Sequence, residues 1–241
     1  MQIVKADATL AKAHEDAIPG LVHSTGPSSY DYQFGTGSLL DTVVRKSWYM
    51  PDTLFSHDAC HLALDGDAVA GFLISFHAPE FRPRGDNLAP LWKELLASGE
   101  LSMDDVSTRL DCFEAARWLN PETRPGIYYI HAVATMPEYR GQKIGLRLVQ
   151  TAIETAKSHG HRAVELDVLS DNPAVSFYRS LGFELLAETK APKPFAGGVP
   201  VEYRMGLTLY HQPELSLSDK LSALMSLSAK RHFRVIAATS L

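Results

Sequence analysis

The sequence predicts a single α/β domain in which strands and helices follow one another along the chain. Short apolar runs typical of strands occur both before and after segments whose apolar residues recur at helical spacing. With 45% hydrophobic and 21% charged residues, the composition is close to the globular average. A chain of 241 residues is also long enough to bury a substantial core. We therefore expect one domain over residues 1–210 and a partly helical tail over 211–241.

The N-terminal part of the chain predicts helices followed by a β-hairpin. Two apolar runs flank Asp65-Gly66-Asp67, and the Asp-Gly pair favours a tight turn between antiparallel strands. The segment from Ser24 to Tyr30 is rich in Ser, Gly and Pro, which is typical of a loop. The expected elements are a strand at 2–6, a helix at 11–18, a loop at 24–30, a helix at 39–48 and strands at 61–64 and 68–76.

Residues 78–125 interrupt the strands and are expected to form a helical insertion beside the core. Pro79, Pro83 and Pro90 break the chain at the start of this segment. The helices expected after them lie at 91–96 and 103–119.

From residue 126 the patterns are sharper. Residues 127–135 form a continuous, mostly apolar run, as expected for a strand covered on both faces. The next helix has apolar residues at helical spacing from Ile144 to Ala156, and Gly160 is placed to end it. Beyond it we expect a strand at 163–169, a short helix opened by Asn172-Pro173 and ended by Gly182, strands at 183–186 and 201–209 around a loop at 191–200, and a helix in the tail from Ser216.

Charge and cysteine content narrow the classes of partner and compartment. A net charge of −5 and a pI near 6.0 argue against a broad nucleic-acid surface, which needs a basic face. Asp7 stands where a signal peptide carries its apolar run, and no stretch approaches the roughly 20 apolar residues of a membrane helix. Two cysteines are too few for a disulfide framework. We expect a cytoplasmic protein that binds neither nucleic acid nor membrane.

The segment from Pro137 to Leu146 joins the strand at 127–135 to a helix through a glycine-containing turn. The N–H groups of such a turn and the helix dipole favour an anion, and Arg140 and Lys143 add two cations at the same point. A pyrophosphate suits this arrangement, although a solvated helix start has the same composition. Neither G-x-x-x-x-G-K-[ST] nor G-x-G-x-x-G after a strand is present, so the P-loop and the dinucleotide fingerprint are excluded.

A second segment, at 171–183, follows the next strand. Taken with the first segment, it resembles the GNAT superfamily of N-acetyltransferases. Arg140-Gly141-Gln142-Lys143-Ile144-Gly145 is similar to the R-G-x-G-x-G/A pyrophosphate loop of that family, and Ala174, Phe177-Tyr178 and Gly182-Phe183 are similar to its later A-x-x-F-Y-x-x-x-G-F pattern. The resemblance is specific over residues 127–186. It implies a mixed, mainly antiparallel central sheet flanked by helices, with an acyl-CoA-binding core at 126–186.

The resemblance also implies the reaction and its donor. The chain would be an N-acetyltransferase that takes acetyl-CoA as acyl donor and needs no metal. The strands at 127–135 and 163–169 would splay apart, so that backbone groups of the first pair with the pantetheine amides. Tyr178 would protonate or hydrogen-bond the leaving thiolate, although packing beside the buried stripe of its helix also explains this residue. The residues expected to contact the donor are Val133, Ala134, Thr135, Arg140, Gly141, Gln142, Lys143, Ile144, Gly145, Leu146, Asn172 and Phe177.

Two positions depart from the family pattern. Lys143 stands where the family has the middle glycine of the loop, so either the loop is reshaped at an energetic cost or the lysine amide still donates while its side chain adds charge. Asp171 stands where the family has an asparagine, and Asn172 comes one residue later. Either Asn172 reaches the donor through a shifted loop, or that contact is missing.

A general base is useful for this reaction because an alkyl amine is mostly protonated at neutral pH. His131 is the candidate, since an imidazole with a pKa near 6.5 can take that proton. The alternative is a hydrogen-bonded histidine inside a strand. Cys60 and Cys112 lie outside both motifs, so no nucleophilic cysteine is indicated. The run from His57 to His61 contains potential metal ligands without a second cluster, and a structural use is favoured.

The sequence thus predicts direct acetyl transfer to an amine, with alternatives that it leaves open. One alternative is a non-catalytic acyl-CoA-binding or regulatory module. Another is a protein-interaction domain that keeps the fold but no longer binds the donor. The donor can carry a longer acyl chain, and the acceptor can be a small amine, an amino sugar, or the N-terminus or a lysine of a peptide or protein. Loops and insertions at 24–38, 78–125 and 190–200 are expected to set the acceptor. A homodimer formed through the C-terminal segment is possible.

Overall fold

The computed structural model describes residues 1–120 and 124–209. Residues Met1–Leu209 form one compact unit. The helix expected in the tail from Ser216 lies outside the described residues.

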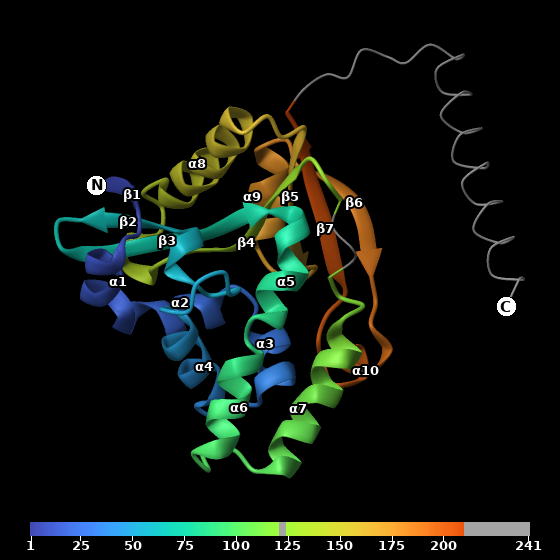
Figure 1. Ribbon diagram of the computed structural model, residues 1–241. Coiled ribbons are helices and arrows are strands. Elements are labelled where there is room, and N and C mark those ends of the chain that lie inside the picture. The colour runs from blue at the N-terminus through green and yellow to red at the C-terminus, as the bar shows by residue number, and fades with distance from the viewer. Residues whose placement is uncertain (121–123, 210–241) are drawn as a thin grey trace, which may run out of the picture. The chain divides into compact units, whose positions relative to one another are not determined.

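A seven-stranded sheet forms the centre of the described chain (Figure 1). The strand order is β1-β2-β3-β4-β5-β7-β6, and every neighbouring pair is antiparallel except β4 and β5, which run parallel. The strands are β1 (Gln2–Lys5), β2 (Cys60–Asp65), β3 (Ala68–His77), β4 (Ile127–Thr135), β5 (Ala163–Leu169), β6 (Glu184–Thr189) and β7 (Glu202–Thr208). The expected mixed, mainly antiparallel sheet flanked by helices is confirmed.

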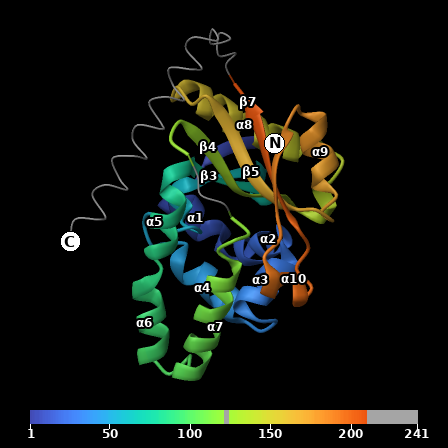
Figure 2. The ribbon, with the colours of Figure 1, turned by 90° about the vertical axis from the view of Figure 1, so that its right-hand side faces the viewer.

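The middle strands are apolar on both sides because helices cover both faces of the sheet (Figures 1 and 2). On one face, α8 (Ile144–Ser158) and α9 (Ala174–Ser180) pack on residues such as Ile130 and Leu166. On the other face, the N-terminal helices and the segment after β3 pack on residues such as Phe72 and Phe76. The helices on this second face are α1 (Ala8–His14), α2 (Ile18–Ser24), α3 (Pro27–Phe34), α4 (Leu39–Ser47), α5 (Phe81–Asp86), α6 (Ala89–Ala97), α7 (Met103–Ala116) and α10 (Pro192–Ala196).

Three helices were not expected, and each has proline in its first turn. Pro27 opens α3 in the segment expected to be a loop at 24–30, Pro83 lies in α5, and Pro192 opens α10 in the loop at 191–200. Proline costs little at these positions because the first N–H groups of a helix have no partner inside it. The expectation of loops at 24–30 and 191–200 was therefore wrong, and so was the expected break of the chain at Pro83.

The helix expected at 11–18 is also wrong in its bounds. Asp7 accepts a hydrogen bond from the backbone N–H of Leu10 at 2.8 Å and starts α1 earlier, at Ala8. The chain then leaves the helical conformation at His14, and α2 begins at Ile18.

Candidate active site

The parallel strands β4 and β5 separate where the sheet faces the helical insertion. Their pairing covers Ile127–Ile130 and Ala163–Leu166, while both strands continue beyond it. On its other side β4 stays paired with β3 as far as Thr135. Met136 donates its backbone N–H to the carbonyl of Ala70 at 2.9 Å, so by alternation the backbone of Ala134 faces β3. The backbone groups of Val133 and Thr135 therefore face the open side.

A left-handed turn leads from β4 into α8 and leaves a row of backbone donors open. Among the described residues, the N–H groups from Gly141 to Leu146 have no hydrogen-bond acceptor, and the first N–H with a partner belongs to Arg147, which donates to Lys143 at 3.1 Å. Gly141 has φ +80° and Lys143 has φ +62°. Six open donors beside the positive end of a helix suit an anion with several oxygens, such as a pyrophosphate.

The backbone conformation of Lys143 shows how the loop holds a lysine where the family pattern has a glycine. It adopts the left-handed conformation, φ 62° and ψ 19°, that a glycine takes readily, so the backbone path of the loop is kept. A residue with a Cβ pays for this conformation with about 1–2 kcal/mol of strain. Gly145 lies next to Thr135, and an added Cβ would make an ordinary van der Waals contact with Thr135 Oγ1 at 3.6 Å.

A cavity of about 820 Å³ extends from the open side of β4 toward the helices of the second face. Such a volume fits a drug-sized ligand. Sheet and motif residues form one wall, including Tyr129 to Thr135, Asp167 to Leu169, Asn172 to Ala174, Tyr178 and Glu202. Helix and loop residues form the other, including Tyr30, Phe34, Leu54, Phe55, Phe81, Leu88, Trp92, Leu110 and Phe113. Segments 24–38 and 78–125 thus line the cavity as expected of an acceptor pocket, whereas no residue of 190–200 does so.

Tyr178 lies on α9 and reaches the cavity from the sheet side. Its side chain is buried, and its ring is 5.4 Å from that of Phe177 and 5.7 Å from that of Phe183. Burial raises the pKa of the Tyr178 hydroxyl above its usual value of 10.0. The hydroxyl is therefore protonated at neutral pH and can donate a hydrogen bond.

His131 occupies a β-bulge of β4 and lines the same cavity. Ile74 pairs with Ala132 and Ser75 with Ile130, so His131 has no opposite residue on β3. Its Nε2 atom is buried, with no hydrogen-bond partner among the described residues. Burial, and then the positive charge of Arg84, lowers the pKa of His131 from 6.5 to about 4. The imidazole is therefore neutral at neutral pH.

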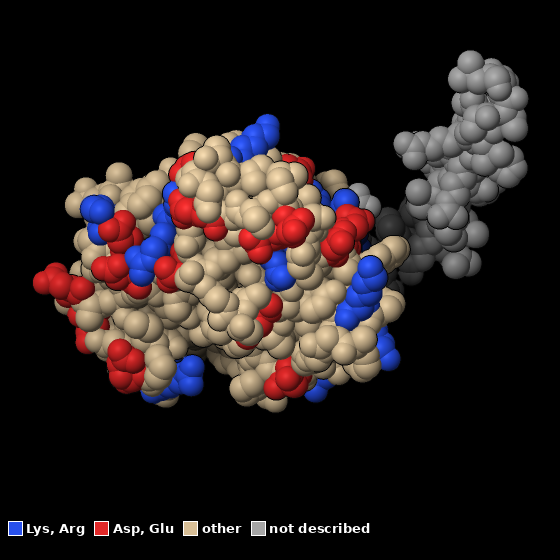
Figure 3. Space-filling view, turned by 90° about the horizontal axis from the view of Figure 1, so that it is seen from below, with Lys and Arg blue, Asp and Glu red and all other residues tan. Residues whose placement is uncertain are grey.

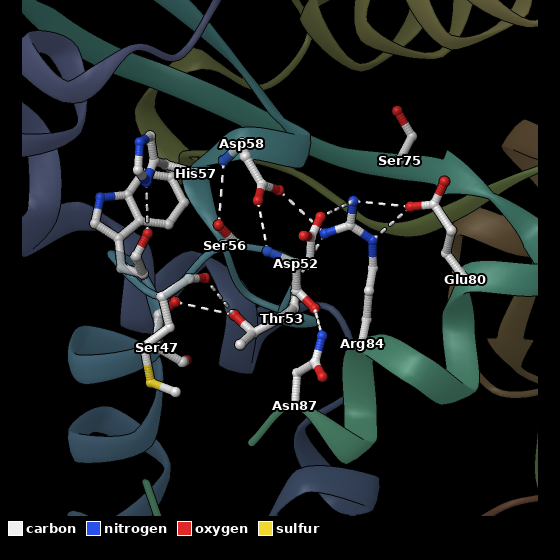
Figure 4. Close-up of polar contacts among 12 residues, drawn as sticks. Ser47, Asp52, Thr53, Ser56, His57, Asp58, Ser75, Glu80, Arg84 and Asn87 are labelled. Atoms are coloured by element: carbon white, nitrogen blue, oxygen red, sulfur yellow. Dashed lines mark hydrogen bonds and ion pairs between the residues drawn. The ribbon is translucent and has the colours of Figure 1, made fainter. Parts of the chain in front are cut away.

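A network of acidic side chains holds Arg84, whose charge acts on His131 (Figure 4 shows the network). Its guanidinium is buried, donates to Glu80 at 2.8 Å and to Asp58 at 3.0 Å, and lies 4.8 Å from the centre of the Phe76 ring. This network ties α5 to the segment before β2. It also places a fixed positive charge behind the cavity, which disfavours a second positive charge on His131.

A second buried network, which the sequence did not predict, joins β4, β5 and β7. Arg204 donates from Nε and Nη2 to Asp167 at 2.6 and 2.7 Å, and from Nη1 to Glu165 at 3.3 Å. Asp167 also accepts from the Tyr129 hydroxyl at 2.8 Å and from the Asn120 amide at 3.1 Å. The sequence did contain a signal for this network. Glu165 and Asp167 lie two residues apart in the otherwise apolar strand 163–169, so their side chains share one face of the sheet.

The remaining predicted residues lie near the cavity without all lining it. The Oδ1 atom of Asn172 accepts from the N–H of Ala174, the first residue of α9, at 2.9 Å, and Asn172 lines the cavity with Arg140. Phe177 and the residues from Gly141 to Leu146 do not line it. An added Cβ on Gly145 would be 3.9 Å from Phe177, which places this ring against the start of α8.

Other candidate chemistry is not assembled within the described residues. Cys60 is fully buried, and burial raises the pKa of its thiol, so it does not supply a thiolate. Nδ1 of His57 lies 2.7 Å from the carbonyl oxygen of Trp48, and no group of three or more metal-ligating side chains is present in this part of the chain. None of the helices in residues 1–120 and 124–209 has the length and hydropathy to cross a membrane. Acidic and basic side chains intermingle on the face drawn in Figure 3.

Comparisons of the sequence with known proteins find acetyltransferases. A sequence profile described as the acetyltransferase (GNAT) family matches residues 32–183. An uncharacterized N-acetyltransferase of Methanocaldococcus jannaschii is 41% identical over 68 residues, which are 28% of this chain and 30% of that protein. N-alpha-acetyltransferase 30 of Schizosaccharomyces pombe is 41% identical over 56 residues, which are 23% of this chain and 37% of that protein. The matched segments therefore span well under half the length of these relatives.

Solved structures share the fold at low sequence identity. An N-acetyltransferase from Staphylococcus aureus has a TM-score of 0.62 at 18% identity, with 86% of this chain and 100% of that chain covered. A Bacillus subtilis acetyltransferase in complex with CoA has a TM-score of 0.50 at 17% identity, with 87% of this chain and 99% of that chain covered.

Proposed function

The chain belongs to the acetyltransferase (GNAT) family, and from this premise we propose that it is an N-acetyltransferase that transfers an acetyl group from acetyl-CoA directly to a primary amine. Acyl transfer is the reaction class of the family. The donor, the acceptor class and the roles of individual residues are parts of the proposal.

The row of open N–H groups from Gly141 to Leu146 is the observation that carries the proposal. A pyrophosphate is the part of CoA that needs such a row, and Lys143 and Arg140 add positive charge to it. The row lies at the end of β4 whose unpaired edge, at Val133 and Thr135, is free to bond an amide-containing chain. Donors for the pyrophosphate and for the pantetheine arm thus follow one another along a single segment of the protein.

The chain's own residues then orient the reactants and manage protons. Acetyl-CoA supplies the activated acyl group as a thioester. The hydroxyl of Tyr178 stays protonated, because burial raises its pKa, and can donate a hydrogen bond to the leaving thiolate. The Nε2 atom of His131 can accept a proton from an amine in the cavity, although with a pKa of about 4 it is a weak base.

The test is release of free thiol from acetyl-CoA in the presence of pooled amines: small alkyl and aryl amines, amino sugars and peptides. We expect release that depends on one pool, together with an acetylated product. The Tyr178→Phe variant should bind CoA as the wild type does and turn over more slowly. Tight CoA binding without thiol release in any pool would instead support the non-catalytic binding module, for which strain at Lys143 is the supporting observation.

A peptide N-terminus is the second acceptor to test. A putative ribosomal-protein-alanine N-acetyltransferase of Bacillus subtilis is 38% identical over 53 residues, which are 22% of this chain and 35% of that protein. The likeness is confined to a short segment, so the peptide pool should contain several different first residues.

A further inference from the structure

One buried carboxyl group in the cavity has no role in the reaction as described so far. Glu202 is the first residue of β7, where it pairs with Leu169 of β5 and Thr189 of β6. Its side chain is 8% exposed and lines the cavity, and its Oε2 atom has no hydrogen-bond partner among the described residues. An unpaired buried carboxyl lowers stability, so a ligand that pairs with it gains affinity.

Neighbouring side chains do not pair with the Oε2 atom of Glu202. Asp167 receives the donors in reach, from Arg204, Tyr129 and Asn120. Burial, and then the negative charge of Asp167, raises the pKa of Glu202 well above 4.5, although Arg204 acts in the opposite direction. Burial and the charge of Asp167 therefore favour the neutral acid form of this carboxyl. Burial, and to a smaller extent the negative charge of Glu202, raises the pKa of Tyr30, which lies on α3 and lines the same cavity.

The opposite wall of the cavity carries an aromatic cluster beside polar and charged residues such as Gln33, Arg82 and Asp86. Phe34 has ring-centre distances of 6.3 Å to Trp92 and 5.0 Å to Phe113, and Trp92 lies 5.5 Å from Phe113. Phe55 and Phe81 continue this wall toward His131, at 5.8 Å from its ring in each case. A ligand that fits both walls has a positive charge at one end and an apolar body at the other.

On the basis of the proposed function, we propose that Glu202 binds the ammonium group of the acceptor and that the acceptor is a primary amine borne on an apolar, aromatic-sized body. Two sources share this chemistry. One is a free arylalkyl amine, and the other is a peptide whose first residue is apolar. The aromatic wall holds the body, and the carboxyl holds the nitrogen on the side of the cavity that also presents His131 and Tyr178.

Binding of such an amine has a proton balance that identifies the carboxyl. The raised pKa of Glu202 favours the carboxylic acid in the free protein, and the amine arrives as an ammonium ion. In the complex, carboxylate with ammonium, or acid with neutral amine, holds one proton fewer than the acid and the ammonium ion held apart. Amine binding therefore releases protons to solvent, up to one for each amine bound, wherever Glu202 is protonated in the free protein. With glutamine in place of Glu202, no proton is released from this position.

The experiment is calorimetric binding of phenethylamine and of phenethyl alcohol, each in the presence of CoA and in buffers of different ionisation enthalpy. The two ligands differ in the group that meets Glu202 and share the aromatic body. We expect the wild type to prefer the amine by at least about tenfold and to release protons when it binds the amine. Glu202→Gln should lose both the preference and the proton release while it still binds the alcohol. Glu188→Gln, the same change at an exposed position of β6, should behave as the wild type.

Equal affinity of the wild type for amine and alcohol would overturn the proposal, as would an unchanged preference in Glu202→Gln. Because each comparison is made within one protein, a general loss of stability in the variant does not mimic the result. A dipeptide amide that begins with phenylalanine distinguishes the two sources, and a preference for it that depends on Glu202 supports the proposal equally. If acetyl-CoA then releases no thiol with a bound amine, the proposed transfer fails while the amine site stands.

Discussion

Replacing Lys143 with glycine should stabilise the protein relative to replacing it with alanine. Both variants lose the lysine charge, but alanine keeps the Cβ atom in the left-handed conformation at φ 62°. Relief of that strain is worth about 1–2 kcal/mol. Glycine in turn lowers the free energy of unfolding by about 0.4–1 kcal/mol, because it makes the unfolded chain more flexible. The free energy of unfolding of Lys143→Gly should therefore exceed that of Lys143→Ala by about 1 kcal/mol.

The same two variants separate the backbone of the loop from its charge in CoA binding. Lys143 is exposed, so loss of its charge should weaken CoA binding by less than about tenfold, and by less still at high salt. The effect should be nearly equal in Lys143→Ala and Lys143→Gly, because the open amides remain in both. Calorimetric titration with CoA at two salt concentrations measures it.

Urea unfolding measures the stability difference, and Gln142→Gly is the matched control. Gln142 lies next to Lys143 but has no positive φ, so glycine relieves no strain there and should cost about 0.5–1 kcal/mol. If Lys143→Gly is no more stable than Lys143→Ala, or if Gln142→Gly is stabilised as well, the left-handed turn before α8 is not what the protein adopts in solution.

Three further predictions follow from the site. Tyr178→Phe should reduce turnover by about 10²–10⁴-fold with CoA affinity unchanged, and an unaffected rate would remove Tyr178 from the chemistry. His131 has a pKa of about 4 in the folded protein against 6.5 in the unfolded chain, so its contribution to stability is present above pH 6.5 and is lost as pH falls toward 4. The wild type should lose up to about 2 kcal/mol from this residue between pH 7 and 5, and His131→Leu should lose correspondingly less in urea unfolding at the two pH values. Equal losses would mean that the imidazole is solvated. Arg204→Met should lower the free energy of unfolding by about 3–5 kcal/mol, because it leaves Asp167 and Glu165 buried with a shared cation removed. A loss below about 1 kcal/mol would show that water reaches this network.

The parts of the fold that could be predicted are those with a strong local signal. The strand at 127–135 is apolar on every face, and the helix after it keeps its apolar spacing from Ile144 to Ala156, so both elements are confirmed. The turn between them carries a compact motif, in which the glycines and cations of one short segment identify an anion site. These signals act within about ten residues and do not depend on the rest of the fold.

The parts that could not be predicted depend on residues far apart in the sequence. Glu202 and Asp167 meet only because β7 pairs with β5, and a glutamate at the start of a strand gives no local indication that it will be buried. The bulge that places His131 in the cavity is set by the register of β3 against β4. The short helix α3 was missed because it begins with Gly26-Pro27 in a segment whose composition matches that of a loop, while packing of Phe34 against the insertion supports the helix.

The measurement that tests the central claim most directly is a count of products from isotope-labelled acetyl-CoA. Wild-type protein is incubated with labelled acetyl-CoA and phenethylamine, or with the phenylalanine-initiated dipeptide amide, and mass spectrometry follows both products. Direct transfer predicts labelled N-acetyl product and free CoA thiol in equal amounts, with the rate lowered in Tyr178→Phe. Bound CoA with no labelled product from any amine, or thiol release matched by labelled acetate alone, would contradict the assignment of this cavity to amine acetylation.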